Sequence, residues 1–112
     1  MSPLELALSY MSCFYNSQNW DALEAILSPS LRFRGPFKSY DSSEAYLRDL
    51  RADPPLDMGY ESLQIYESIG AVCLFYQMRK GDLRVPMAQT FQVKGKLISE
   101  IELVFDTALF KA

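Results

Sequence analysis

The first fifteen residues place apolar side chains along one side of a helix. Ser2 and Pro3 suit a helix start, and Glu5 completes a capping box with Ser2. The apolar positions then follow at intervals of three and four: Leu4, Ala7, Leu8, Met11, Phe14 and Tyr15. This spacing predicts an amphipathic helix of about four turns.

A second, shorter helix is expected after Asn19, since asparagine caps helix N-termini well. Its buried side is formed by Trp20, Leu23, Ile26 and Leu27, and Pro29 disfavours helical geometry at Ser28. Beyond it, Leu31, Phe33 and Gly35 alternate with Arg32 and Arg34. Alternation with period two predicts a half-buried strand.

A third helix is expected from the capping sequence at residues 41–44 to about Arg51, before Pro54 and Pro55. Four strands follow at residues 61–69, 71–79, 83–93 and 97–105, separated by Gly70, Gly81-Asp82 and Lys94-Gly95. Turns this short favour an antiparallel meander. The order ααβαββββ therefore predicts one α+β domain over residues 1–112, with three helices on one face of a mostly antiparallel sheet.

The strand at residues 71–79 is apolar on both faces. Val72, Leu74, Tyr76 and Met78 share one side, whereas Cys73 and Phe75 share the other. Because large exposed apolar patches are unusual on monomers, we expect a homodimer through the outer sheet face. The alternative is that Cys73 and Phe75 only support a strongly coiled sheet. In the last strand, Leu97, Ser99, Ile101, Leu103 and Phe105 are expected on one side, opposite a solvated Glu100 and Glu102.

Composition narrows the chemistry. Fourteen acidic and eleven basic residues give a net charge of −3, which disfavours nucleic acid and anionic membrane surfaces as partners. No apolar run is long enough to cross a bilayer and no signal peptide is evident, so a cytoplasmic location is expected. Histidine is absent, and Cys13 and Cys73 lie in apolar segments as expected for buried free thiols. We therefore expect no metal and no cofactor.

Three segments resemble the nuclear-transport-factor-2-like superfamily: FYNSQNWDALEAILSPSLRFRGPF at residues 14–37, the helix at 41–50 and GKLISEIELVFD near the end. Among its members, the SnoaL-like polyketide cyclases and ketosteroid-isomerase-like proteins are the most similar. The resemblance implies a cone, in which a curved sheet wraps around the helices and leaves an apolar pocket. Many members are homodimers, but their functions range from isomerases to non-catalytic binders.

The resemblance also allows the steroid-isomerase residues to be tested one by one. The general-base position matches Gly35, the oxyanion-binding tyrosine position matches Met11, and the protonated aspartate position matches Gln89 or Ala88, with strand phase favouring Gln89. None carries the required side chain, so steroid isomerisation by that mechanism is not expected.

Other chemistries of the superfamily remain open. An epoxide-hydrolase-like set would draw on Arg79, Arg84 and Asp106, while the acid of a cyclase-like site would come from Asp57, Glu61, Glu67 or Asp106. The phase of Leu63, Ile65 and Ile69 predicts that Glu61 and Glu67 point inward. The catalytic residue, if there is one, stays unknown from the sequence.

The sequence thus favours a domain that binds a small apolar ligand. The residues expected to line its site are Met11, Phe14, Tyr15, Phe33, Gly35, Phe37, Leu50, Tyr60 and Gln89, with Tyr60 and Gln89 as polar groups. The alternatives are an aromatic core with no cavity, a divergent cyclase-like enzyme that transfers a proton on a carbonyl substrate, and a dimeric interaction module. An open neutral pocket favours the binder, a pocket with a buried carboxylate favours the enzyme, and a filled cone favours the module.

Overall fold

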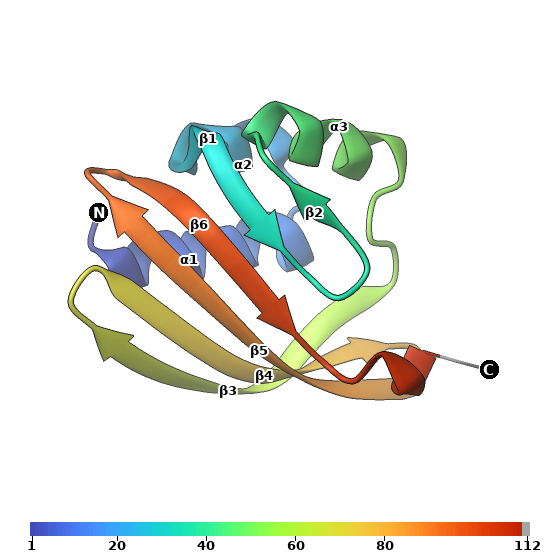
Figure 1. Cartoon of the computed structure of the whole chain (residues 1–112). Helices are drawn as coiled ribbons and strands as arrows, with labels where there is room; N and C mark the ends of the chain where they lie inside the picture. Colours follow the sequence, from blue (N-terminus) through green and yellow to red (C-terminus); the bar gives the residue numbers. More distant parts are fainter. Residues whose placement is uncertain (111–112) are drawn as a thin grey trace.

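The computed structural model describes residues 1–110 and shows one curved sheet with α1, α2 and α3 packed on its concave face (Figure 1). The helices are α1 (Pro3–Met11), the π-helix η1 (Ser12–Asn16), α2 (Trp20–Ile26), α3 (Ser43–Ala52) and the 3₁₀ helix η2 (Thr107–Phe110). The strands are β1 (Leu27–Arg34), β2 (Ser39–Tyr40), β3 (Met58–Ser68), β4 (Ala71–Lys80), β5 (Leu83–Lys94) and β6 (Leu97–Val104).

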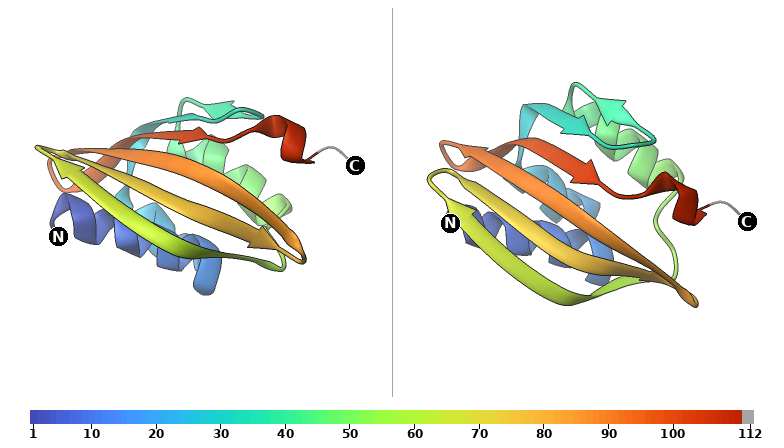
Figure 2. Two further views of the ribbon diagram at one scale, coloured as in Figure 1. Left: turned by 90° about the horizontal axis from the view of Figure 1, so that it is seen from below. Right: turned by 60° about the horizontal axis from the view of Figure 1, so that its bottom comes forward.

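The sheet order is β2-β1-β6-β5-β4-β3. Every neighbouring pair is antiparallel except β1 and β6, which run parallel. Seen from the side, α1, α2 and α3 all lie on one side of the sheet, and no helix of residues 1–110 covers the other side (Figure 2). The predicted α+β cone and the order of its elements are confirmed, with the two-residue strand β2 as an unpredicted addition.

The capping box at the start of α1 forms as expected. Ser2 N–H donates to Glu5 Oε1 at 3.0 Å, and Glu5 N–H donates to Ser2 Oγ at 3.1 Å. The predicted apolar stripe is confirmed at Ala7 and Met11, but the buried side also includes Leu6 and Tyr10, whereas Leu8 is exposed. Tyr10 can be buried because its hydroxyl finds a hydrogen-bond partner on α3, which a polarity pattern does not reveal.

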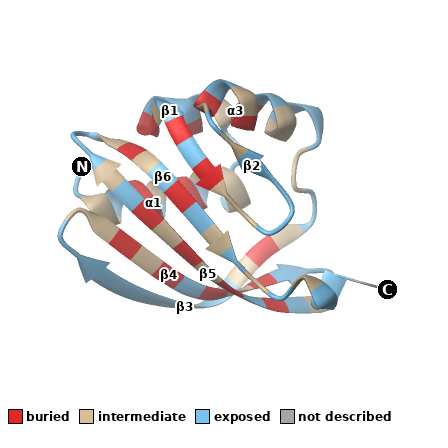
Figure 3. Cartoon of the chain, in the orientation of Figure 1, coloured by how far each residue is buried: buried red, intermediate tan, exposed pale blue. Residues whose placement is uncertain are grey.

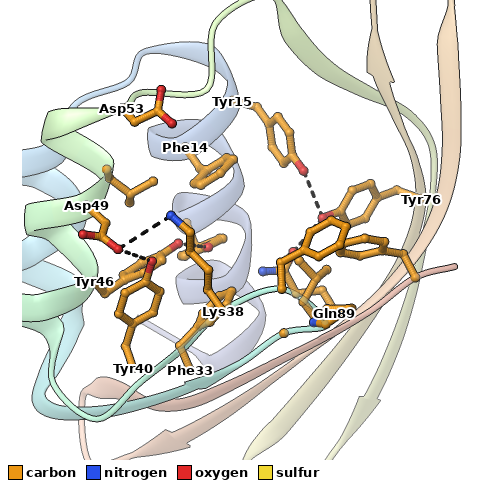
Figure 4. Close-up of a pocket in the computed structure, with 17 residues that line it drawn as sticks. Phe14, Tyr15, Phe33, Lys38, Tyr40, Tyr46, Asp49, Asp53, Tyr76 and Gln89 are labelled. Carbon is orange, nitrogen blue, oxygen red and sulfur yellow. Dashed lines mark hydrogen bonds and ion pairs between the residues drawn. The ribbon is translucent and has the colours of Figure 1, made fainter. Parts of the chain in front are cut away.

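The first helix also ends differently from the prediction. The α-helix stops at Met11, and the next turn widens into η1, where Ser17 N–H donates to Ser12 O at 3.0 Å. An i to i+5 bond of this kind is a π-turn, which often occurs at functional sites. The wider turn presents Phe14 and Tyr15 toward the inside of the cone (Figure 4).

The helix α2 is shorter than predicted. Asn19 caps it as expected, but it ends at Ile26, and Leu27 already belongs to β1. Pro29 therefore lies inside a strand, in the stretch where the pairing of β1 with β6 shifts register. A proline is tolerated there because an irregular pairing does not need its missing N–H.

Burial alternates along the inner strands (Figure 3). The inner residues of β4 are buried as predicted: Val72, Leu74, Tyr76 and Met78. Phe75, on the outer face, is 45% exposed. The core is continuous between this inner face and the helices, from Leu6 and Leu23 to Phe91 and Ile101.

Two bulges overturn the predicted phase in part of β3 and part of β6, while Ile65 and Glu67 keep the predicted inward phase opposite Leu74 and Val72. In β3 the register shifts between Glu61 and Gln64, so Glu61 pairs with Gln77 on the outer face instead of pointing inward. In β6 the register shifts opposite Gln92 and Val93, so Ile98 is buried in place of the expected Leu97 and Ser99, whereas Ile101 and Leu103 face inward as predicted. A bulge adds one residue to a strand and thereby exchanges its faces.

No helix formed by residues 1–110 combines the length and the apolar character needed to cross a membrane.

Candidate functional site

A cavity of about 210 Å³ opens between the helices and the inner face of the sheet (Figure 4). Four groups of residues line it: Tyr10, Phe14 and Tyr15 from α1 and η1; Phe33, Gly35, Pro36, Phe37, Lys38 and Tyr40 around the β1–β2 turn; Tyr46, Asp49, Leu50 and Asp53 on or just after α3; and Tyr76, Gln89, Leu103 and Phe105 from the sheet. Most of this lining is aromatic. The cone is therefore not filled by its own side chains.

Five polar groups form the deep wall of the cavity. Tyr76 of β4 and Gln89 of β5 both project from the inner face, and the Tyr76 hydroxyl donates to Gln89 Oε1 at 2.7 Å. The Tyr15 hydroxyl lies 3.1 Å from the Tyr76 hydroxyl. Since the one proton of Tyr76 is already engaged by Gln89, Tyr15 is the donor of that bond. Tyr10 and Tyr46 form a separate hydroxyl pair that joins α1 to α3.

These tyrosines are held in the neutral form. Burial raises the pKa of Tyr15 to about 12, against the opposing effect of its bond with Tyr76. Burial is also the main reason that the pKa values of Tyr10, Tyr46 and Tyr76 are raised. The deep wall is thus uncharged at neutral pH, and its hydroxyls act as hydrogen-bond donors.

The deep wall has more hydrogen-bond donors than its own hydrogen bonds require. The Tyr10–Tyr46 pair holds two hydroxyl protons, and its single mutual bond uses only one. The Gln89 amide has two N–H groups, of which its neighbour Tyr10 can engage at most one. Tyr10, Tyr46 and Gln89 all line the cavity, so an occupant could reach these spare donors. They would suit an acceptor oxygen.

The mouth of the cavity is charged and partly open to solvent. The Tyr40 hydroxyl donates to Asp49 Oδ2 at 2.7 Å, and Lys38 Nζ lies 3.7 Å from the same oxygen (Figure 4). Burial, followed by the hydrogen bond and the negative charge of Asp49, raises the pKa of Tyr40. Asp53, four residues after Asp49, also lines the mouth. Within residues 1–110, no three acidic or cysteine side chains gather in a way that could hold a metal ion.

The β1–β2 turn brings an aromatic collar to the mouth. Gly35 N–H donates to Lys38 O at 3.0 Å, and a Cβ on Gly35 would lie 3.2 Å from the Phe33 ring. A side chain at residue 35 would therefore require the Phe33 ring to shift by a few tenths of an ångström. Phe37 at its tip is exposed and meets the rings of Phe105 and Phe110 edge-on, with centroid distances of 5.4 and 5.7 Å.

Seven of the nine predicted site residues line the cavity: Phe14, Tyr15, Phe33, Gly35, Phe37, Leu50 and Gln89. Met11 does not, because it is fully buried in the core. Tyr60 packs edge-on against Tyr15 and Tyr76, at centroid distances of 5.2 and 5.7 Å, behind the cavity wall. Whether the seven residues bind a ligand stays a prediction.

None of the four carboxylates considered from the sequence lines this cavity. Asp57 and Glu67 are exposed, and Asp106 accepts a hydrogen bond from Ala108 N–H at 2.9 Å. Glu61 instead forms an ion pair with Arg84 at 2.9 Å.

The two arginines considered for an epoxide-hydrolase-like site, Arg79 and Arg84, also lie outside the cavity lining. Arg79 covers Gly59, which has no side chain to obstruct it, and Arg84 lies with Glu61. An Asp-Arg-Asp arrangement does not form in the cavity.

Several lining residues were not found from the sequence. Three of them, Tyr46, Asp49 and Asp53, follow helical spacing with the predicted Leu50 on and just after α3, so the helical period would have grouped them with it. Tyr10 and Tyr76 differ, because the sequence gives no sign that their hydroxyls meet partners from other elements. Lys38 enters the site only through the fold of the β1–β2 turn.

Comparison with solved structures identifies the architecture. An NTF2-like protein of unknown function from Cytophaga hutchinsonii superposes with a TM-score of 0.84, at 21% identity over 99% of this chain and 96% of the other. A candidate ketosteroid isomerase from Kribbella flavida gives 0.80, at 19% identity over 91% and 76%. A candidate polyketide cyclase from Xanthomonas campestris gives 0.79, at 14% identity over 96% and 93%.

The chain therefore has the nuclear-transport-factor-2-like fold, and the resemblance seen in the sequence is confirmed at that level. No model of a known protein family matches the sequence. No curated protein matches it at a significant level either. Likeness at 21% identity and below establishes the fold and leaves the activity to be inferred from the site.

Proposed function

We propose that this protein binds a small, largely apolar molecule whose acceptor oxygen is held at the deep wall of the cavity. The observation that supports it most is the pairing of an aromatic cavity with unused neutral donors at Gln89 and at the Tyr10–Tyr46 pair. An apolar lining with a few convergent polar groups is typical of small-molecule sites. Gln89 is only 2% exposed, so a donor left unused there favours an occupant.

The volume limits the size of that molecule. A cavity of about 210 Å³ is smaller than the ~300–1,000 Å³ of sites for drug-sized ligands and equals about seven water molecules at ~30 Å³ each. We therefore favour a molecule of one or two rings over a four-ring skeleton. The absence of a carboxylate from the deep wall favours binding over proton abstraction there.

Native mass spectrometry of freshly purified protein tests the proposal directly, with calorimetric titration of aryl ketones such as acetophenone as the second arm. Leu103→Trp should fill the cavity and weaken ketone binding at least about ten-fold, because Leu103 is part of its wall. Glu24→Trp is the control, since Glu24 is exposed on α2 and lies neither in the cavity lining nor on the outer sheet face. Equal binding by both variants, or no bound molecule and no binding by the wild type, would reject the proposal.

An enzyme that moves a proton beside a carbonyl group is the second candidate. Two carboxylates, Asp49 and Asp53, do line the cavity, although at its mouth. The test is deuterium exchange at the carbon next to the carbonyl of a bound ketone, followed by NMR. Exchange that the protein accelerates, and that Asp49→Asn or Asp53→Asn abolishes, would establish the enzyme; no acceleration would leave a binder.

We also propose that a second copy of the chain covers the outer sheet face. Tyr66, Phe75 and Val104 are all exposed there, and the Tyr66 and Phe75 rings meet edge-on at 5.6 Å. Charges of both signs flank them, with Arg32 and Glu100 3.9 Å apart, so the face can be self-complementary. Light scattering should give twice the mass of one chain, and Phe75→Lys should halve that mass. The mass of a single chain at micromolar concentration would reject the dimer.

A further inference from the structure

We propose that the ligand carries a protonated amine, held at the mouth by Asp49 and Asp53, in addition to its acceptor oxygen. This rests on the proposed function and names the chemical class of the molecule. It places the two polar ends of the ligand at opposite ends of the cavity: the oxygen on the neutral deep wall and the amine on the acidic mouth.

The charge at the mouth is negative. Two carboxylates, Asp49 and Asp53, face one ammonium, Lys38, among the residues that line the cavity. The arginines of α3 do not correct this imbalance because each is already paired: Arg48 with Glu44 at 3.0 Å and Arg51 with Asp21 at 2.8 Å. A cationic group would therefore be attracted to the mouth, and a carboxylate would be repelled.

The position of the two carboxylates on α3 strengthens this field. The helix ends at Ala52, so Asp49 lies in its last turn and Asp53 immediately after it. Helix C-termini carry partial negative charge, which disfavours acidic side chains there. The two acidic residues are thus unfavourable for the end of α3, and they lie at a cavity mouth. Residues that are unfavourable for their local structure are often found at functional sites. The last carbonyl groups of the helix add to the attraction for a cation.

The mouth already accommodates an ammonium group. Lys38 points toward Asp49, and its Nζ lies 3.7 Å from Oδ2, the same oxygen that Tyr40 engages (Figure 4). Within residues 1–110, neither contact occupies Asp49 Oδ1. Lys38 is 61% exposed in its side chain and can move aside at small cost. The rings of Phe14, Tyr15 and Tyr40 line the same cavity and would add cation–π attraction to a ligand amine.

The deep wall supplies the independent reason to expect an occupant. Gln89 is 98% buried, its Oε1 is taken by Tyr76, and at least one of its N–H groups is left for the cavity. An acidic mouth alone would be an ordinary solvated helix end. Together with the unused donors of a neutral wall, it defines a molecule with an acceptor at one end and a cation at the other.

Para-substituted acetophenones measure separately what the carbonyl end and the charged end of the ligand contribute to binding. Calorimetric Kd values are measured for 4′-(aminomethyl)acetophenone, 4′-(hydroxymethyl)acetophenone and 4-acetylbenzoic acid, which share ring and carbonyl but differ in charge. We expect the amine to bind about two- to five-fold more tightly than the alcohol, as for an exposed ion pair, and the acid to bind most weakly. Added salt should reduce the preference for the amine. 4-Ethylbenzylamine, which lacks the carbonyl, should lose affinity relative to the aminomethyl ketone.

Substitutions of Asp49 and Asp53 test whether the preference for the amine arises at the mouth of the cavity. Asp53→Asn and Asp49→Asn should each lower the amine-to-alcohol preference by about two- to five-fold, because this ratio of Kd values cancels any change that the variant makes to the cavity itself. Glu44→Gln, on the same helix but paired with Arg48, is the matched control and should leave the preference unchanged. Lys38→Gln should increase the preference, because it removes the competing ammonium.

The outcomes distinguish this inference from the proposed function. If the alcohol binds and Leu103→Trp blocks it, but the amine binds no better, the amine inference fails and the proposed function stands. If none of the ketones binds, both fail. A preference for the amine that survives both Asp→Asn changes would also overturn the role of the mouth.

Discussion

Two neighbouring residues of β4 lie on opposite faces of the sheet and show how the two faces differ. Tyr76 points inward, is 4% exposed, and has its hydroxyl bonded to Gln89. Phe75 points outward and is 45% exposed beside Gln64 and Ala88. Both are aromatic and lie on the same strand, so the difference comes from what covers each face: helices inside, and outside no other segment of the described residues 1–110 (Figure 2).

The comparison shows that aromatic content does not distinguish a site from an uncovered surface. The inner face carries tyrosines whose hydroxyls join α1, η1, α3 and the sheet into hydrogen-bonded groups. The outer face offers apolar side chains without such a network. Shape and unused donors suit a small molecule, whereas a flat apolar band suits another protein surface.

The largest expected effect is on packing. Phe91→Ala should lower the free energy of unfolding by about 3–5 kcal/mol, because Phe91 is fully buried and its ring packs edge-on against Tyr10 at 5.1 Å. Phe75→Ala, the same substitution on the outer face, should cost less than about 1 kcal/mol. Urea denaturation at one fixed low protein concentration measures both. Phe91→Leu serves if the alanine variant does not fold, with a smaller loss. Similar losses at both positions would contradict the difference between the faces.

The second effect is a loss of stability at alkaline pH. Tyr15 has a pKa of about 12 in the folded chain against 10.0 for an ordinary tyrosine, so the folded state keeps a proton that the unfolded state releases. This contribution is complete below pH 10 and is lost as the pH rises from 10 to 12, at up to about 1.4 kcal/mol per pH unit. Tyr10, Tyr46 and Tyr76, whose pKa values are also raised, act in the same direction.

Urea denaturation at a series of pH values, with tyrosinate absorbance recorded in parallel, measures this loss. Tyr15→Phe should reduce the slope, since one of the groups responsible is removed. A free energy of unfolding that does not fall between pH 10 and pH 12 would show that the inner-face tyrosines are not shielded as the structure indicates.

Local patterns predicted much of the fold. The capping box at Ser2, the cap at Asn19 and the alternation of β4 each depend on neighbours in sequence, and all three are present. The inward phase of Gln89 was also predicted by alternation with Phe91. Such signals persist because the local preference and the tertiary structure agree.

The errors occur where one residue shifts the phase or where a partner is distant in sequence. Ser62 adopts a positive φ of 59° in the β3 bulge, and the sequence has no glycine at this position that would have predicted it. The Tyr10–Tyr46 bond joins residues thirty-six positions apart, and Asp49 meets Lys38 only after the β1–β2 turn forms. The apolar half of the site was therefore predictable from periodicity, whereas its hydrogen bonds and its charged mouth depend on the folded geometry.

The smallest effect concerns a single hydroxyl on each face. Tyr76→Phe removes the donor to Gln89 Oε1 and the acceptor for Tyr15 without changing the ring. A buried acceptor left unpaired costs about 1–3 kcal/mol, so this variant should be destabilised by that amount in urea denaturation. Tyr66→Phe is the matched control: its hydroxyl donates to Gln64 Oε1 at 3.2 Å on the exposed outer face, and its loss should change stability by less than about 0.5 kcal/mol. If Tyr76→Phe is as stable as Tyr66→Phe, then water or a bound molecule already satisfies Gln89 Oε1. The inner hydroxyl would then contribute no more to the free energy of unfolding than the outer one. A loss confined to Tyr76→Phe would instead show that the hydrogen bonds of the wall hold the cavity in shape before any ligand arrives.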